Sequence, residues 1–146
     1  MTVTLKSHLG CPFCNIASGN EKDTLLVYDD LEVCAFQYPN PDSDNHFIVL
    51  SKVHIPDYNS LTEQDIDLLE KMQTVGGRLL NQVIEPGTPI RMGFLPKSLS
   101  PVNHLHMHCL ALPLTCGWMR RLLYKPLIFF DSKDLIGEVK ESCYNL

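Results

Sequence analysis

Apolar and polar residues alternate with the two-residue period of a β-strand in several short stretches of this chain. The first two stretches flank the pair Asp29-Asp30, a pattern typical of a β-hairpin. A run of turn-forming residues at positions 38–45 then leads into the third. The pattern predicts five strands, at residues 25–28, 32–36, 46–50, 90–94 and 104–112.

A helical period replaces the strand period after residue 61 and continues to about residue 84. Thr62, followed three residues later by Asp65, resembles a capping box, and Glu85-Pro86-Gly87 is a stop signal. Two shorter helices are predicted at residues 118–124 and 133–143, the second capped by residue 131 or 132. One long helix among short strands predicts an α+β domain on a five-stranded antiparallel sheet.

The length of 146 residues suits one domain, predicted at residues 10–146 after a flexible tail at residues 1–9. An apolar content of 45% and a charged content of 20% exclude wholesale disorder. No apolar run is long enough to cross a bilayer, and residues 1–10 contain no apolar signal segment. We therefore expect a cytoplasmic or nuclear protein that does not bind membranes.

The net charge is −5, and basic residues are scattered apart from the pair Arg120-Arg121. A nucleic-acid backbone binder needs a clustered basic face, so we expect no nucleic-acid partner. An acidic protein can still bind one small nucleotide through local donors.

Three histidines, His104, His106 and His108, stand at every second position near the end of the apolar pattern. In an extended strand they share one face, while the residues between them face the core. A row of imidazoles suits nucleophilic attack and proton transfer, phosphate binding, or metal binding. The spacing alone leaves these alternatives open.

These histidines resemble the signature His-φ-His-φ-His-φ-φ (φ apolar) of the histidine triad family of nucleotide hydrolases and transferases. The segments at residues 46–55 and 11–16 resemble the central strand and the opening segment of that family. Arg91-Met92-Gly93-Phe94 and residues 117–124 most resemble the third branch of the histidine triad nucleotide-binding (Hint) proteins. The resemblance extends from about residue 10 to the C-terminus and implies a homodimer.

The resemblance implies a hydrolase that cleaves nucleoside 5′-phosphoramidates or acyl-adenylates to the nucleoside monophosphate, without a cofactor for the hydrolysis itself. His106 would be the nucleophile and form a nucleotidyl-histidine, and His108 would bind the phosphate and assist the leaving group. His104 and His46 would complete the cluster. The residues implied around a purine nucleotide are Phe13, Ile16, Phe36, Tyr38 and Asn103. The alternative is a nucleotide-binding regulatory or scaffold protein with little turnover.

Two positions depart from the family pattern and favour that alternative. Tyr38 stands where most members have an aspartate that accepts from the ribose hydroxyls, and a phenol cannot chelate a diol as a carboxylate does. Pro101 stands where many members have a serine that donates to the phosphate or leaving nitrogen. Proline offers no donor, which leaves Ser100 and Asn103 as the nearby replacements.

Six cysteines without a signal segment are expected to be reduced thiols. Cys11 and Cys14 form a CxxC, which reads as two buried thiols, as a pair of zinc ligands or as a redox pair. By the resemblance, a structural zinc would use these cysteines with His46 and His104. His54 is expected to have a structural or surface role.

Overall fold

A computed structural model describes residues 9–145 of the chain. The predicted tail therefore lies outside the described residues, apart from residue 9. Within the described range no helix combines the length and the apolar character needed to cross a membrane.

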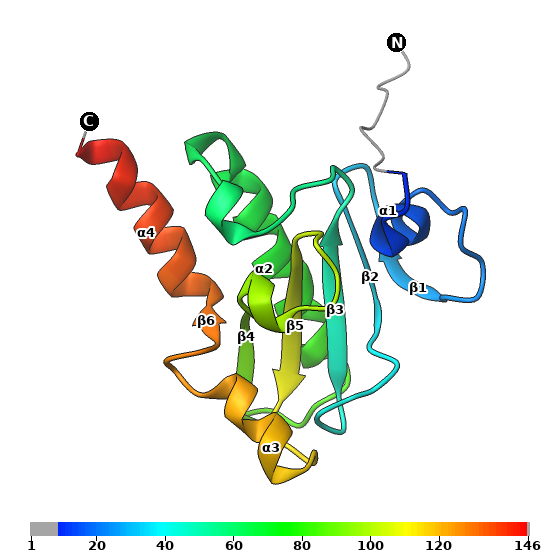
Figure 1. Ribbon diagram of the computed structural model, residues 1–146. Helices are drawn as coiled ribbons and strands as arrows, with labels where there is room; N and C mark the ends of the chain where they lie inside the picture. The colour runs from blue at the N-terminus through cyan, green and yellow to red at the C-terminus, as the bar shows by residue number, and fades with distance from the viewer. Residues whose placement is uncertain (1–8, 146) are drawn as a thin grey trace.

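The strands form one antiparallel sheet (Figure 1). Its members are β1 (Leu26–Asp29), β2 (Val33–Gln37), β3 (His46–Ser51), β4 (Ile90–Phe94), β5 (His106–Ala111) and β6 (Phe130–Asp131). Their spatial order is β1-β2-β3-β5-β4-β6, so β3 and β5 lie side by side in the middle although some sixty residues separate them. The α+β class is confirmed, and the central pair of strands carries most of the predicted site.

The predicted number of five strands was wrong by one. The additional strand β6 pairs with β4 through Gly93 opposite Asp131 and Phe94 opposite Phe130. A two-residue strand shows no period in the sequence, because it is defined by its partner. The fifth strand is also shorter than predicted and begins at His106, so His104 lies in the segment that leads into it.

Residues 9–145 also form four α-helices: α1 (Pro12–Ala17), α2 (Ile66–Asn81), α3 (Trp118–Arg121) and α4 (Ser132–Tyr144). Short 3₁₀ helices occupy Tyr58–Ser60, Glu63–Asp65, Lys97–Leu99 and Leu122–Tyr124. The capping box at Thr62 and Asp65 is present, and the Asp131 side chain caps α4 by accepting from the Lys133 N–H. Helix α2 ends at Asn81, three residues before the predicted end.

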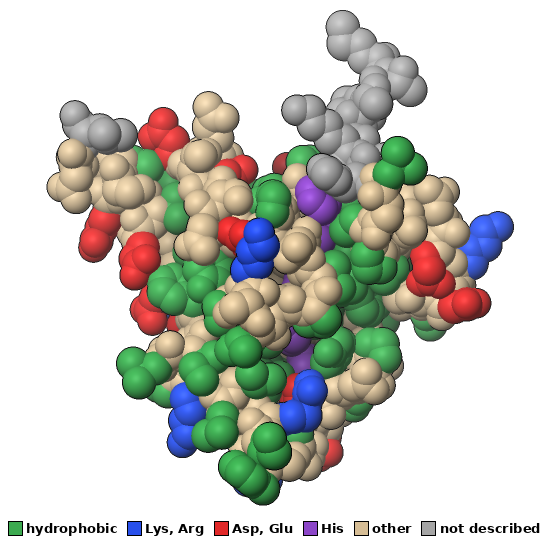
Figure 2. All heavy atoms as spheres, viewed as in Figure 1, with side chains coloured by type: hydrophobic (Ala, Val, Ile, Leu, Met, Phe, Trp, Pro, Cys, Tyr) green, Lys and Arg blue, Asp and Glu red, His purple; other side chains and the backbone are tan. Residues whose placement is uncertain are grey.

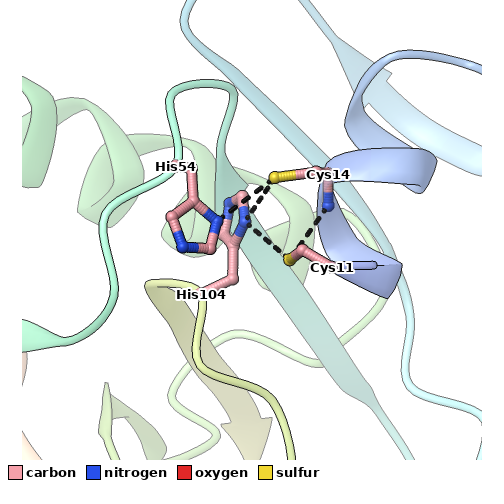
Figure 3. A group of neighbouring side chains, drawn as sticks. All are labelled: Cys11, Cys14, His54 and His104. Carbon is pink, nitrogen blue, oxygen red and sulfur yellow. Dashed lines mark hydrogen bonds between the residues drawn. The ribbon is translucent and has the colours of Figure 1, made fainter. Parts of the chain in front are cut away.

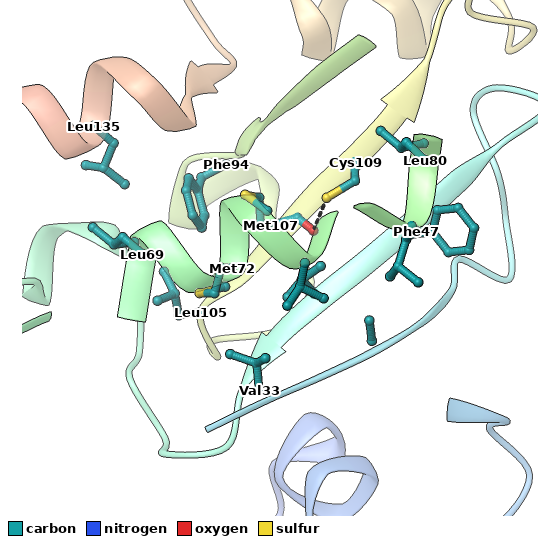
Figure 4. Packing of buried hydrophobic residues seen from close by; sticks show 14 of the residues in the cluster. Val33, Phe47, Leu69, Met72, Leu80, Phe94, Leu105, Met107, Cys109 and Leu135 are labelled. Atoms are coloured by element: carbon teal, nitrogen blue, oxygen red, sulfur yellow. Dashed lines mark hydrogen bonds between the residues drawn. The ribbon is translucent and has the colours of Figure 1, made fainter. Parts of the chain in front are cut away.

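The main core lies between α2 and the face of the sheet that it covers (Figures 1 and 4). Alternate residues of the central strands point into it, including Val49 of β3 and Met107 of β5, both fully buried. Ile48, one position away from Val49, belongs to a second apolar cluster on the opposite face. The strand period therefore gives α2 one face of the sheet and leaves the histidine side chains on the other.

Candidate active site

Four histidine side chains gather on the face of the sheet opposite α2. His46 begins β3 and His108 lies in β5, where its partner across the strands is Ile48. His106 lies half-buried two residues before His108, and His104 is buried just outside the strand. Figure 2 shows patches of histidine in a hollow between apolar side chains. The structure thus brings together all four histidines that were predicted to form the site.

His106 has one nitrogen fixed and the other available. Its Nδ1 lies 2.6 Å from the main-chain oxygen of His104, which can only accept, so Nδ1 carries the proton. The lone pair of a neutral ring must then be on Nε2. Ser100 Oγ lies 3.5 Å from this Nε2, but its hydroxyl donates to the main-chain oxygen of Val102. Burial lowers the pKa of His106, so the neutral ring with its Nε2 lone pair is favoured.

A chain of hydrogen bonds sets the tautomers of His46 and His108. The main-chain N–H of Asp42 donates to His46 Nδ1 over 3.1 Å, so the proton of the neutral ring is on Nε2. That N–H donates to His108 Nδ1 over 2.9 Å. The proton of His108 is therefore on its Nε2, on the side of the ring turned away from His46.

Burial keeps both rings of this pair neutral. It lowers the pKa of His46 to about 4, although the nearby Asp42 carboxylate opposes the shift. Burial also lowers the pKa of His108 well below its usual value, with the neighbouring His106 and His46 acting in the same direction. Near pH 7 the pair consequently offers a fixed N–H donor and no positive charge.

Asp42 is a functional residue that the sequence reasoning missed. Its carboxylate is 1% exposed and accepts from Arg120 Nε over 2.5 Å and Nη2 over 2.9 Å, and from the Tyr124 hydroxyl over 2.5 Å. Burial alone would raise the pKa of Asp42, but the bonds from Arg120 and Tyr124 outweigh it and the pKa is lowered. The turn-rich segment that contains Asp42 predicted only a loop. The sequence signal for a buried carboxylate was its partner, the pair Arg120-Arg121 among otherwise scattered basic residues.

An aromatic slot adjoins the histidines. The Phe13 ring lies 4.9 Å from the His106 ring and 6.0 Å from the Phe36 ring, measured between centroids. Ile16 is buried in the same cluster, and Tyr38 packs against its edge. Asn103 is exposed and lines a pocket that also includes His106. These positions agree with the predicted nucleotide-contacting set, whose contacts with a nucleotide stay a prediction.

The CxxC pair lies next to two histidines (Figure 3). The candidate ligand atoms of Cys11, Cys14, His54 and His104 all lie within 4.8 Å of one another. The expected partner His46 is not in this group, because both of its ring nitrogens are bonded in the Asp42–His108 chain. The expected ligand set is corrected accordingly: His54, for which we expected a structural or surface role, takes the place of His46.

The geometry of this cluster fits a tetrahedral zinc ion. Zinc–sulfur and zinc–nitrogen bonds of usual length at a tetrahedral angle place sulfur and nitrogen about 3.6 Å apart. His104 Nδ1 lies 3.5 Å from each cysteine sulfur, and His54 Nδ1 lies 3.2 Å from the sulfur of Cys14. His104 Nε2 lies 2.7 Å from the main-chain oxygen of Ser51, which directs the Nδ1 lone pair toward the thiols.

Comparison with known proteins agrees with the site. Residues 10–123 match the sequence profile of the family described as "scavenger mRNA decapping enzyme C-term binding". A protein of Arabidopsis thaliana, named bifunctional adenosine 5′-phosphosulfate phosphorylase/adenylylsulfatase HINT4, is 40% identical across 89% of this chain and 91% of its own length. The chain belongs to the histidine triad superfamily.

Other members of the superfamily are also similar to this chain, and the name of one of them fits the resemblance to the third branch. Adenosine 5′-monophosphoramidase HINT3 of Xenopus tropicalis is 29% identical across 92% of this chain and 90% of its own length. Among solved structures, a histidine triad protein from Clostridium difficile has a TM-score of 0.66 and 26% identity, covering 76% of this chain and 97% of its own. The resemblance read from the triad and the central strand is confirmed.

Proposed function

We propose that the protein is a nucleotide hydrolase that transfers a nucleoside 5′-monophosphate group to His106 and then to water. The observation that carries this proposal is the tautomer of His106, which places an unshared electron pair on Nε2 beside an aromatic slot. The names of the relatives, which include adenosine 5′-monophosphoramidase and adenylylsulfatase, support the same chemistry.

In the first step, Nε2 of His106 attacks the α-phosphorus and the bond to the leaving group breaks, with its electron pair going to the leaving atom. The adduct is an adenylyl-imidazolium, because Nδ1 keeps its proton and donates it in a hydrogen bond to the main-chain oxygen of His104. Water then attacks phosphorus and releases the monophosphate, one proton and neutral His106. Throughout, the Nε2–H of His108 stabilises charge on the phosphoryl oxygens.

The leaving group distinguishes two substrate types. An amine must gain a proton as it leaves, and a neutral imidazole such as His108 is too weak an acid to supply one. Pro101 offers no donor either. A sulfate or carboxylate leaves as a stable anion and needs no proton. We therefore expect mixed anhydrides, such as adenosine 5′-phosphosulfate or an acyl-adenylate, to react faster than phosphoramidates.

The test uses wild-type protein and His106→Ala with adenosine 5′-phosphoramidate and adenosine 5′-phosphosulfate. We expect wild type to release adenosine monophosphate, and rapid quenching in mild base followed by intact mass measurement to show an adenylylated chain. His106→Ala should lose both signals, at least a thousandfold in rate. If both proteins bind adenosine monophosphate by calorimetry but turn over equally slowly, the regulatory alternative replaces this proposal.

We also propose that Cys11, Cys14, His54 and His104 hold a structural zinc ion. The ion would tie α1 to the segment before β5 and supply no step of the hydrolysis. We expect about one zinc per chain by elemental mass spectrometry in wild type and in Cys34→Ser, a buried cysteine outside the cluster. Cys14→Ser should lose the metal and part of its thermal stability.

His54→Gln and His46→Gln separate the corrected ligand set from the expected one. The corrected set predicts weaker zinc binding in His54→Gln only. Zinc lost from His46→Gln but kept by His54→Gln would contradict the assignment, as would a wild-type protein that binds no zinc. Chelation of the metal should leave the turnover of the folded fraction unchanged.

A further inference from the structure

Arg120 lies at the junction between the aromatic slot and the histidine pair. Its guanidinium hydrogen-bonds the Asp42 carboxylate and interacts electrostatically with Tyr38, and its side chain is 48% exposed. The Tyr38 ring lies 4.7 Å from the His46 ring and 5.6 Å from the His108 ring. Tyr38 also packs against the cluster that contains Phe36. The pair Arg120–Tyr38 therefore adjoins both parts of the nucleotide site.

The two ends of a bound nucleotide fix where its ribose lies. In the proposed hydrolysis the α-phosphorus must approach His106 Nε2, and the base would occupy the slot beside Phe13 and Phe36. The ribose joins these two positions. Tyr38 packs against the slot on one side and the histidine pair on the other, so the ribose of a nucleotide bound in this way would lie against Tyr38, next to Arg120.

The groups around this position are donors. A guanidinium has five N–H groups, of which two donate to the Asp42 carboxylate, so three remain. The Tyr38 hydroxyl interacts with Arg120 and can donate through its own O–H. The Asp42 carboxylate is buried and already accepts three hydrogen bonds, so it does not serve as the acceptor for a ribose diol.

We propose that Arg120 and Tyr38 form an anion subsite for a phosphate on the ribose, so that the preferred substrates are 5′-conjugates of a 2′- or 3′-phosphorylated adenosine. This inference rests on the proposed nucleotide hydrolysis and specifies its substrate class. Arg120 is held in place by Asp42 before any ligand arrives, so little side-chain freedom is lost on binding. Because the Arg120–Asp42 pair has no net charge, recognition depends on short, oriented hydrogen bonds.

Calorimetry with three product-type ligands at one ionic strength tests the subsite. The ligands are adenosine 5′-monophosphate, adenosine 3′,5′-bisphosphate and adenosine 2′,5′-bisphosphate. We expect one bisphosphate to bind wild type at least tenfold more tightly than the monophosphate, and which isomer it is shows whether the 2′ or the 3′ position faces Arg120. The quantity compared between variants is this ratio of dissociation constants, because a general disturbance of the site weakens all three ligands alike.

Arg121→Gln is the matched control, since the neighbouring Arg121 is bonded to main-chain oxygens of Leu114 and Cys116. It should keep the ratio, whereas Arg120→Gln should reduce it to near one. Arg120→Lys keeps a cation for Asp42 but loses the spare donors, so it folds with a reduced ratio, and Tyr38→Phe loses part of the preference.

A wild-type ratio near one, or a full ratio in Arg120→Gln, would overturn the subsite while leaving the proposed hydrolysis intact. If wild type binds none of the three ligands, the proposed function itself fails, and the subsite fails with it.

Discussion

At the scale of single residues, each site histidine differs from the others in what its second nitrogen contacts. His104 and His106 each place one nitrogen on a main-chain oxygen, which leaves the opposite nitrogen with a lone pair. His46 accepts from a main-chain N–H, which reverses the order and makes His108 a donor. Four identical side chains thus provide two lone pairs, on His104 and His106, and one N–H donor, on His108, whose tautomer is set through His46.

Pro101 gives a prediction about the leaving group. Pro101→Ser restores the serine hydroxyl that many members of the superfamily have at this position, where it donates to the phosphate or to the leaving nitrogen. We expect turnover of adenosine 5′-phosphoramidate to rise about tenfold, the value of one hydrogen bond to a charged group. Turnover of adenosine 5′-phosphosulfate should change less than twofold. Steady-state kinetics with both substrates checks this.

Pro101→Ala provides the control for the loss of the proline ring and should leave both rates near those of wild type. An equal rise for both substrates in Pro101→Ser would show that the substitution acts on the loop rather than on leaving-group protonation.

The sequence predicted which histidines form the site better than it predicted the contacts that each one makes. His46, His104, His106 and His108 were expected together and lie together, because strand period and pairing decide which side chains share a face. Strand period and pairing could not predict that His54, rather than His46, lies beside the cysteines. His54 follows β3, and its position depends on where the chain turns after the strand.

At the scale of elements, long periodic segments were predicted well and contact-defined ones were not. The capped helix α2 and the central strands follow from their own periods. Strand β6 and the attachment of Asp42 to Arg120 depend on segments that meet only in the folded chain. The local sequence does not indicate such long-range contacts, apart from the types of the residues involved.

The close approach of α2 to the sheet gives a prediction at this scale. A Cβ added at Gly76 would lie 2.5 Å from the sulfur of Cys109 and 3.0 Å from the methyl group of Met107. We expect Gly76→Ala to lower the free energy of unfolding by about 1–3 kcal/mol, the usual cost of overpacking a core. Denaturant unfolding monitored by circular dichroism measures this.

Gly77→Ala, one position further along the same helix, is the control. Its Cβ would have only an ordinary contact, 3.8 Å from Met92, so removing a helical glycine should be neutral or stabilise by up to about 1 kcal/mol. Equal destabilisation by both substitutions would contradict the packing argument. The double variant Gly76→Ala with Cys109→Ala should recover part of the loss.

At the scale of the whole molecule, the homodimer implied by the family resemblance stays a prediction. Exposed apolar side chains gather around α3, where Trp118 is 74% and Met119 67% exposed. Large exposed apolar patches often mark protein interfaces. We expect sedimentation equilibrium to give about twice the chain mass of 16.6 kDa, and Trp118→Glu to shift the protein toward the monomer.

Leu31→Glu, which alters another highly exposed apolar side chain in the β1–β2 turn, should leave the association unchanged. A wild-type protein that sediments as a single chain at micromolar concentration would contradict the prediction, and α3 would then be a surface of the monomer.

The hydrogen bonds from Arg120 and Tyr124 to the Asp42 carboxylate affect when the protein becomes active during its synthesis. Every site histidine has been translated once the chain reaches residue 108, yet the groups that hold the Asp42 carboxylate come from residues 120 and 124. A nascent chain that stops between these points would bury a carboxylate without its cation, at a cost of about 3–5 kcal/mol. We therefore expect the nucleotide chemistry to appear only after residues 118–124 have left the ribosome, so that the reactive histidines are synthesised before they become active.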